Sequence, residues 1–273
     1  DDPEKEGIIG KLVYLLEGKE EVCKGRQILI GTHYHGGLYQ GSDKNRMLWE
    51  EVQNYIEAHY DTDYLKRVYI CGDGANWIKA GKDYVDKSVL VADKYHLMKY
   101  INRVAKLTLD DAETTKGRFY RYIYKNKLLA AKKLLTRIEN VSGNEKTVDE
   151  TRKYLVNNWE AIQRAFRDKH ALGCSAEGHV SHVLSERMSS RPMGWSETGS
   201  DRMCKLRCYV KNHGINGIID LVEYRRRKKL EEQKATGTDG MMVCFIECLV
   251  TVVAVVRRTG CSKPFSGLLN ITS

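Results

Sequence analysis

The chain has 273 residues and a mass of 31.3 kDa, enough for one large domain or two modest ones. Hydrophobic residues make up 42% of it, charged residues 30%, and only three residues are proline, which excludes a disordered, collagen-like or low-complexity chain. The 45 Lys and Arg exceed the 36 Asp and Glu, and the resulting charge of +9 favours a polyanionic partner, most simply nucleic acid.

In the N-terminal part, β-prone apolar runs predict strands at residues 11–16 and 25–30. A short polar stretch separates the two runs, which predicts an antiparallel pair. Apolar residues then recur at helical spacing and predict an amphipathic helix over residues 44–59, after an N-cap signal at Ser42 and Asp43.

The next segment alternates strands with helices. The run 65–71 predicts a strand that ends just before Asp73, a short helix is expected at 76–81, and the run 88–92 predicts a strand that ends at Asp93. This alternation predicts an α/β layer.

From residue 94 to 170, helical spacing and basic residues dominate. This stretch holds 18 Lys and Arg against 9 Asp and Glu, so its charge of +9 equals that of the whole chain. Most charge runs are the solvated face of a helix. Here the concentration of charge favours a surface for DNA phosphates equally well.

The C-terminal part begins with a glycine- and serine-rich stretch, residues 171–200, for which loops are expected. Helices are expected at 204–209 and 215–232, the second with a basic block at Arg225–Lys229. The sequence thus divides into four parts: the N-terminal part of the core (1–93), a basic helical insertion (94–170), the C-terminal part of the core (171–240) and an apolar tail without an assigned role (241–273).

Asp73 and Asp93 each follow the end of a predicted strand. Side chains at the carboxyl ends of parallel strands face the crevice where α/β proteins bind ligands, and the glycines around Asp73 leave room for a substrate. Taken alone, each aspartate also suits an Asx turn or a helix cap, which is the commoner role at such positions.

The cysteines and the apolar tail bear on the compartment. Eight cysteines form no CxxC pair and no signal peptide is recognisable, which predicts a reducing compartment, the cytoplasm. The apolar run Met241–Val256 contains Glu247 and is shorter than the roughly 20 residues of a bilayer-spanning helix, so no membrane segment is predicted.

The segment 174–182 also suggests a zinc site. Cys174, His179 and His182 are zinc-ligand types close together in the sequence, although their spacing matches no standard zinc motif. A fourth ligand would come from one of three residues: Cys204, Cys208 or His96.

Longer strings carry a resemblance to a known family. They are Gly72–Lys79 (GDGANWIK), Asp93–Tyr100 (DKYHLMKY), Ser175–His182 (SAEGHVSH) and Ser189–Ser196 (SSRPMGWS), the last followed by Lys205–Arg207 (KLR). Together they resemble the ISLre-type insertion-sequence transposases, a bacterial family similar in layout to the Mutator-type DDE transposases. The resemblance covers roughly residues 10–240 and fades beyond them.

The resemblance implies an RNase H-like catalytic core, and the predicted strand order agrees with that fold. In it, the first carboxylate lies on the first strand and the second follows strand four. The runs 11–16 and 25–30 would be strands two and three. The run 65–71 would be strand four, which makes Asp73 the second catalytic Asp, and residues 94–170 an insertion before the helix with the final Glu.

For that final carboxylate the resemblance favours Glu177 over Glu186, and it gives Asp93 and His96 a structural or DNA-contacting role, with Asp93 as an alternate metal ligand. Hard cations take oxygen ligands, so carboxylates from separate elements converge on two Mg²⁺ (or Mn²⁺) ions. Such a pair of ions activates the attacking oxygen and stabilises the leaving oxygen of a phosphodiester.

The first strand and its Asp fall upstream of residue 1, so we expect a fragment or truncated copy of a DDE-type transposase. Its expected partner is double-stranded DNA, with a homo-oligomer as the active form. The alternatives are a non-catalytic DNA-binding remnant and a small zinc-binding structural protein. The residues expected to contact DNA are His96, Lys99, Lys132, Lys133, Arg187, Arg191, Trp195, Arg225, Arg226 and Arg227.

Overall fold

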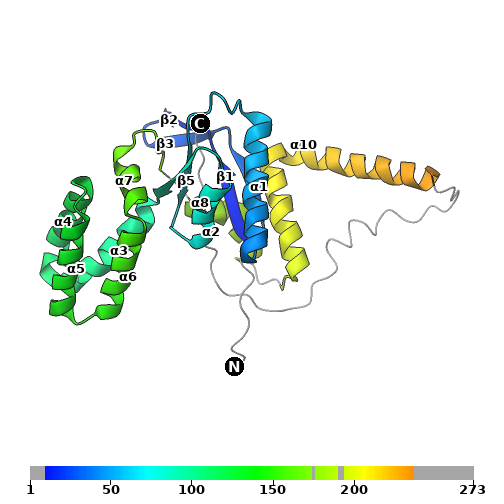
Figure 1. The fold of residues 1–273 in the computed structure, drawn as a ribbon. Helices are drawn as coiled ribbons and strands as arrows, with labels where there is room; N and C mark the ends of the chain where they lie inside the picture. Colours follow the sequence, from blue (N-terminus) through cyan, green and yellow to red (C-terminus); the bar gives the residue numbers. More distant parts are fainter. Residues whose placement is uncertain (1–9, 174–175, 190–193, 236–273) are drawn as a thin grey trace. The chain divides into compact units, whose positions relative to one another are not determined.

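The computed structural model describes residues 10–173, 176–189 and 194–235 (Figure 1). Contacts group the chain into two compact units. Within the described residues, a terminal unit holds 10–12, 33–40 and 177–235, and a central unit holds 13–32 and 41–176. None of the helices in these ranges combines the length and apolar content that crossing a bilayer requires.

Two parallel strands form the centre of the central unit. Strand β5 (Val68–Gly72) is fully buried and pairs with β6 (Ser88–Ala92) in the register Val68↔Ser88 to Gly72↔Ala92. Parallel neighbours need a crossover connection, which here contains α2 (Asn76–Lys79) and η1 (Ala80–Asp83). Both predicted strands are confirmed: β6 has the predicted bounds, and β5 is shifted from the predicted run 65–71 to 68–72.

Helix α1 (Gly41–His59) confirms the predicted amphipathic helix and buries one apolar face. Its Trp49 is fully buried and donates from Nε1 to the carbonyl oxygen of Trp77 at 2.8 Å. Gly81 permits this packing, because a Cβ there would lie 2.7 Å from the Trp49 ring.

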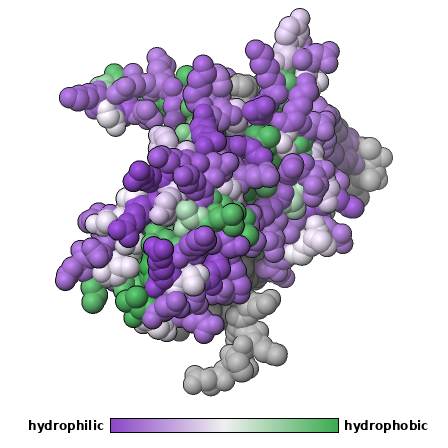
Figure 2. Space-filling view, turned by 60° about the vertical axis from the view of Figure 1, so that its left-hand side comes forward, coloured by the Kyte–Doolittle hydropathy of each residue, from purple (hydrophilic) through white to green (hydrophobic). Residues whose placement is uncertain are grey.

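A helical region follows β6, as the sequence predicts. It contains α3 (Lys94–Ala105), η2 (Lys106–Asp111), α4 (Ala112–Tyr124), α5 (Leu128–Ser142), α6 (Glu145–Asn157) and α7 (Trp159–Arg167). Their apolar stripes share one core that includes Ile101, Phe119, Leu135 and Leu155. The charged side chains lie outside this core, and hydrophilic residues cover most of the face shown in Figure 2.

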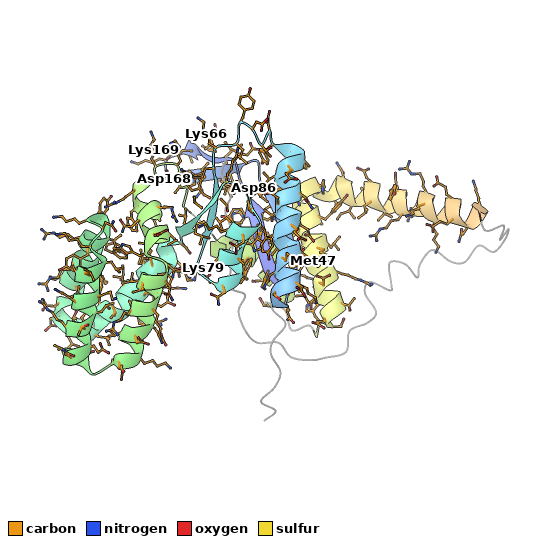
Figure 3. The ribbon with its side chains drawn as sticks, viewed as in Figure 1. Met47, Lys66, Lys79, Asp86, Asp168 and Lys169 are labelled. Atoms are coloured by element: carbon orange, nitrogen blue, oxygen red, sulfur yellow. The ribbon has the colours of Figure 1, made fainter. Side chains whose placement is uncertain are left out.

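Helix α7 packs against the strand pair. Ala165 joins Tyr69, Cys71 and Val91 in a small buried cluster. At the end of α7, Asp168 (Figure 3) accepts a hydrogen bond from the Tyr69 hydroxyl at 2.7 Å and pairs with Arg67 at 3.3 Å. This hydrogen bond, with Arg67 adding to it, holds the pKa of Asp168 below its ordinary value.

The predicted pairing of the first two strands is wrong. The run 25–30 forms β3 (Arg26–Ile30), but its partner is β2 (Gly18–Cys23), a strand that was not predicted. Strand β1 (Lys11–Leu15) confirms the run 11–16 and pairs with β4 (His33–Gly37). The α/β class is confirmed, and the described strands pair as β1–β4, β2–β3 and β5–β6.

The terminal unit is built on α10 (Glu197–Ala235), which kinks at Gly214 and is drawn as two segments in Figure 1. Two separate helices were predicted here, at 204–209 and 215–232, and the non-helical backbone of Gly214 (φ 68°, ψ −172°) does divide α10 into two helical segments, although the first begins earlier, at Glu197. Residues 171–200 were expected to be mainly loop, yet they contain α8 (Ala176–Val180), the π-helix η3 (Ser181–Ser185), α9 (Glu186–Met188) and the start of α10. The apolar tail 241–273 lies outside the described residues.

Candidate functional site at the ends of β5 and β6

Asp73 and Asp93 lie side by side at one edge of the central unit. They directly follow Gly72 and Ala92, which pair with each other at the end of the β5–β6 ladder. The backbone N–H of Asp93 also donates to the carbonyl oxygen of Gly72 at 2.9 Å. Two aspartates therefore share the carboxyl edge of a parallel strand pair, where α/β proteins place ligands.

The Asp73 carboxylate is only partly engaged by the protein. Its Oδ1 accepts a hydrogen bond from the backbone N–H of Ala75 at 2.9 Å, which closes an Asx turn. Its Oδ2 makes no hydrogen bond among the described residues. One oxygen thus shapes the loop and the other is available for a ligand.

The Asp93 carboxylate is fully engaged. Its side chain is 5% exposed; Oδ1 caps α3 by accepting from Tyr95 N at 2.9 Å, and Oδ2 lies 2.7 Å from His96 Nδ1. This hydrogen bond raises the pKa of His96 above its ordinary value, and the charges of Asp93 and Asp73 add to the effect. Each oxygen of Asp93 thus accepts one hydrogen bond, and Asp93 orients His96; its role as an alternate metal ligand stays a prediction.

Two buried polar residues close the back of the site. Gly74 has φ +89, and a Cβ on it would lie 2.7 Å from Oδ1 of Asn158, which is buried and donates to the carbonyl oxygen of Tyr154 at 2.8 Å. Burial raises the pKa of Tyr154, and the carboxylates of Asp93 and Asp73 raise it further. Neither residue was predicted from the sequence, because nothing in their local spacing marks them.

A cavity of about 260 Å³ lies beside Asp93. Its walls are mostly apolar and come from β5, β6, the start of α3, α7 and the segment after α7. The lining residues are Cys71, Val91, Ala92, Asp93, Lys94, Tyr95, Ala165, Ala171, Leu172 and Gly173.

The predicted final carboxylates belong to the terminal unit. Glu177 lies in α8, and its side chain is outside the described part of the chain. Glu186 begins α9 and is largely exposed, with Oε2 3.4 Å from Arg207 Nη2. Convergence of Asp73 and Glu177 on shared metal ions stays a prediction.

The zinc reading receives no support from the described residues, which contain no group of three or more His, Cys, Asp or Glu able to hold a metal ion. Cys174 lies outside them. His179 Nδ1 is 2.9 Å from the Tyr34 hydroxyl, and Cys204 Sγ is 3.3 Å from the sulfur of Met188. Burial raises the pKa of Cys204 to about 12, which opposes the thiolate that zinc needs.

The residues predicted to contact DNA lie in both units. Lys99 lies on α3 with Nζ 4.5 Å from the Tyr95 ring centre. On α5, Lys132 is half-buried and Lys133 is exposed. Arg225, Arg226 and Arg227 are exposed on the segment of α10 that follows Gly214. Arg191 lies outside the described residues.

Trp195 is half-buried in the terminal unit. The guanidinium of Arg187 lies 5.8 Å from its ring centre, a cation–π arrangement. Its Nε1 is buried and makes no hydrogen bond in the described part of the terminal unit. The ring contact fits a packing role, and a role in holding DNA stays a prediction.

Comparison with known proteins places the chain in a family. The model of an uncharacterised protein family, UPF0236, matches residues 4–228. The chain belongs to the UPF0236 family. Two UPF0236 proteins of Caldanaerobacter subterraneus subsp. tengcongensis are 38% identical over 223 residues, which cover 81% of this chain and 45% or 46% of theirs.

A further UPF0236 protein, from Streptococcus gallolyticus and named for the vanSb 3′ region, is 25% identical over 213 residues, 73% of this chain and 44% of its own length. The chain thus spans a little under half the length of the curated relatives it matches. The name of one Caldanaerobacter relative joins eleven loci of a single strain. No solved structure matches the chain.

Proposed function

We propose that this UPF0236 chain is part of a DDE-type transposase with an RNase H-like core, which cleaves and joins DNA strands with the help of Mg²⁺ or Mn²⁺. The observation that carries the proposal is Asp73, with one free carboxylate oxygen, beside Asp93 at the carboxyl edge of two parallel strands. The resemblance to ISLre-type transposases assigns the second catalytic carboxylate to the same residue.

The chain's own residues have distinct roles in this proposal. Asp73 supplies a metal ligand through Oδ2, and a further carboxylate ligand would come from Glu177. When bound, the metal ions would activate the attacking oxygen and stabilise the leaving oxygen of the phosphodiester. Asp93 holds the His96 ring, so that Nε2, which makes no hydrogen bond in the described central unit, can donate to a DNA phosphate.

Two further observations support a DNA-mobilising role. The helices between residues 94 and 170 hold the charge of +9, which suits the phosphate backbone. In addition, a relative whose name joins eleven loci of one strain occurs in many copies, as expected of a sequence that moves or copies itself within a genome.

Mobilisation of a marked copy tests the proposal. The gene with its native flanking DNA is placed on a donor plasmid, and insertion of the flanked marker at new chromosomal sites is counted by sequencing. Asp73→Asn should abolish insertion, because an amide cannot replace the charged ligand. Asp110→Asn, at an exposed aspartate in η2, is the matched control and should insert like wild type. Equal insertion by Asp73→Asn and wild type would refute the role of Asp73.

Binding to DNA separates the transposase from a non-catalytic remnant. Affinity for duplex DNA should fall log-linearly as salt rises from about 50 to 200 mM, because phosphate contacts release counterions. The remnant would bind with the same salt slope but give neither Mg²⁺-dependent cleavage nor insertion. An affinity for DNA that does not change with salt concentration would contradict both the transposase and the DNA-binding remnant.

A further inference from the structure

The segment that carries Glu177 and Glu186 is interrupted by a π-turn. In η3 the backbone N–H of Glu186 donates to the carbonyl oxygen of Ser181, five residues back, whereas Ser189 N donates four residues back to Ser185 at 2.9 Å. A π-turn contains one residue more than an α-turn and recurs at functional sites. It also leaves carbonyl groups without their usual partner four residues on.

One of those carbonyl groups belongs to the buried Val183, whereas His182 is exposed. Val183 is 1% exposed and Leu184 is fully buried. A buried backbone carbonyl without a hydrogen-bond donor destabilises the fold, so a donor from elsewhere in the molecule to the Val183 carbonyl stabilises the π-turn.

Arg207 on α10 is that donor. Its Nε donates to the carbonyl oxygen of Val183 at 2.7 Å, and its Nη2 donates to that of His182 at 2.8 Å. The same Nη2 lies 3.4 Å from Oε2 of Glu186. One planar guanidinium thus binds two carbonyl groups and a carboxylate, a geometry that lysine cannot reproduce.

The start of the segment is tied to α10 by a second route. His179 in α8 is bonded to the Tyr34 hydroxyl at 2.9 Å. The backbone N–H and carbonyl oxygen of Tyr34 are bonded in turn to the Asn212 amide, at 2.8 and 2.9 Å. Asn212 lies on α10. Hydrogen bonds therefore connect α10 both to α8, through Tyr34, and to the π-turn, through Arg207.

The π-turn changes the angular relation between positions 177 and 186. Nine residues of regular α-helix turn the chain by two and a half turns, which puts the two positions about 180° apart. Because the wide turn absorbs one residue, the offset becomes that of eight residues, about 80°.

We propose that Arg207 is a positioning residue, whose guanidinium holds the π-turn in place and so fixes the helix phase between positions 177 and 186. The value of this phase for catalysis rests on the proposed function, since it decides which glutamate the helix presents to the metal ions. The hydrogen-bond role of Arg207 does not depend on that function.

Hydrogen exchange measured by mass spectrometry on the full chain tests the hydrogen-bond role. Arg207→Met should speed exchange of the amides between residues 181 and 189 by about tenfold or more, because the charge-assisted bonds to the carbonyl groups of His182 and Val183 are lost. Arg202→Met, at an exposed arginine on the same helix, should leave that exchange unchanged. Arg207→Lys keeps the charge but not the paired N–H donors of the guanidinium, and it is the variant to use if Arg207→Met unfolds the unit. It should also speed exchange of the amides between residues 181 and 189.

Deletion of the exposed Ser181 makes the test specific to the π-turn. Without the extra residue the segment can form regular α-helical bonds, so Arg207→Met in the deletion background should change exchange by less than about threefold. Equal acceleration in both backgrounds, or none in either, would overturn the proposal.

The mobilisation assay then tests positioning. Insertion should fall at least tenfold in Arg207→Met and recover when Ser181 is also deleted, because the deletion keeps the flanking phase without needing the clamp. Normal insertion by Arg207→Met despite faster exchange would overturn the positioning role. If wild type itself does not insert, the proposed function fails, while the exchange data still decide the role of Arg207.

Discussion

Substitution of Gly74 by alanine combines two separable costs at the candidate site. The first is conformational, because φ is +89 at Gly74 and alanine is strained there. The second is steric, because the new Cβ would lie 2.7 Å from Oδ1 of Asn158, whose amide is held by its bond to the Tyr154 carbonyl oxygen. The flexible end of a long side chain could move away, but a buried and hydrogen-bonded amide cannot do so without losing that bond.

Two other glycines of the central unit isolate these costs. Gly143 ends α5 with φ +65, and a Cβ added there would meet no described atom within 4 Å, so Gly143→Ala carries the conformational cost alone, about 1 kcal/mol. Gly117 is exposed within α4, and alanine there carries neither the conformational nor the steric cost. Gly117→Ala should therefore raise the free energy of unfolding by about 0.5–1 kcal/mol. Gly74→Ala adds an overpacking cost of about 1–3 kcal/mol, for a total destabilisation of about 2–4 kcal/mol.

Urea unfolding of the four proteins, followed by tryptophan fluorescence, measures this series. The expected order of midpoints is Gly117→Ala above wild type, then Gly143→Ala, then Gly74→Ala, with similar slopes. A midpoint for Gly74→Ala equal to that of Gly143→Ala would show that Asn158 yields freely. A midpoint equal to wild type would refute the left-handed turn beside Asp73.

Three further outcomes follow from the side-chain environments. Asp93→Asn should lower the pKa of His96 in an NMR titration, since the Asp93 carboxylate is the main cause of its raised value. The free energy of unfolding that this substitution removes should be largest below about pH 6.5 and should shrink as pH rises through the folded-state pKa. An unchanged His96 titration would contradict the pairing. Trp195→Phe should keep the fold, and unchanged DNA affinity in a folded Trp195→Ala would favour the packing role over a DNA contact. Peptide mapping after brief alkylation at about pH 8 should find the exposed Cys23 modified and the buried Cys204, whose pKa is raised to about 12, unmodified until urea unfolds the chain.

The predictable part of the fold is the part with strong periodicity. Helix α1 buries one apolar face, β5 is buried throughout, and β6 is an apolar run that is half-buried to buried, so their apolar patterns reveal them. Strand β2 (GKEEVC) is mostly exposed and lacks that signal; it exists because it pairs with β3. In β4 the pair Gly36-Gly37 suggests a chain break, yet Gly36 sits within a strand because a Cβ there would lie 2.7 Å from Cys208 Sγ on α10.

The same distinction applies to the candidate site. Adjacency of Asp73 and Asp93 follows from two consecutive parallel strands, so sequence order predicts it. Asn158 and Tyr154 reach the site from α6 and its end, and only tertiary packing brings them there. Arg207 stood in a recognised string, but its partners are backbone carbonyl groups freed by a π-turn, and no side-chain pattern announces such a turn.

Hydrogen-bond accounting also separates the two aspartates chemically, although the sequence presents them alike. Asp93 gives one oxygen to the helix cap and the other to His96, so both of its oxygens already accept a hydrogen bond. Asp73 gives one oxygen to its turn and keeps the other open. Because a cation gains most from an oxygen that no protein donor already satisfies, we propose Asp73 as the better metal ligand of the pair, with Asp93 holding His96 beside it.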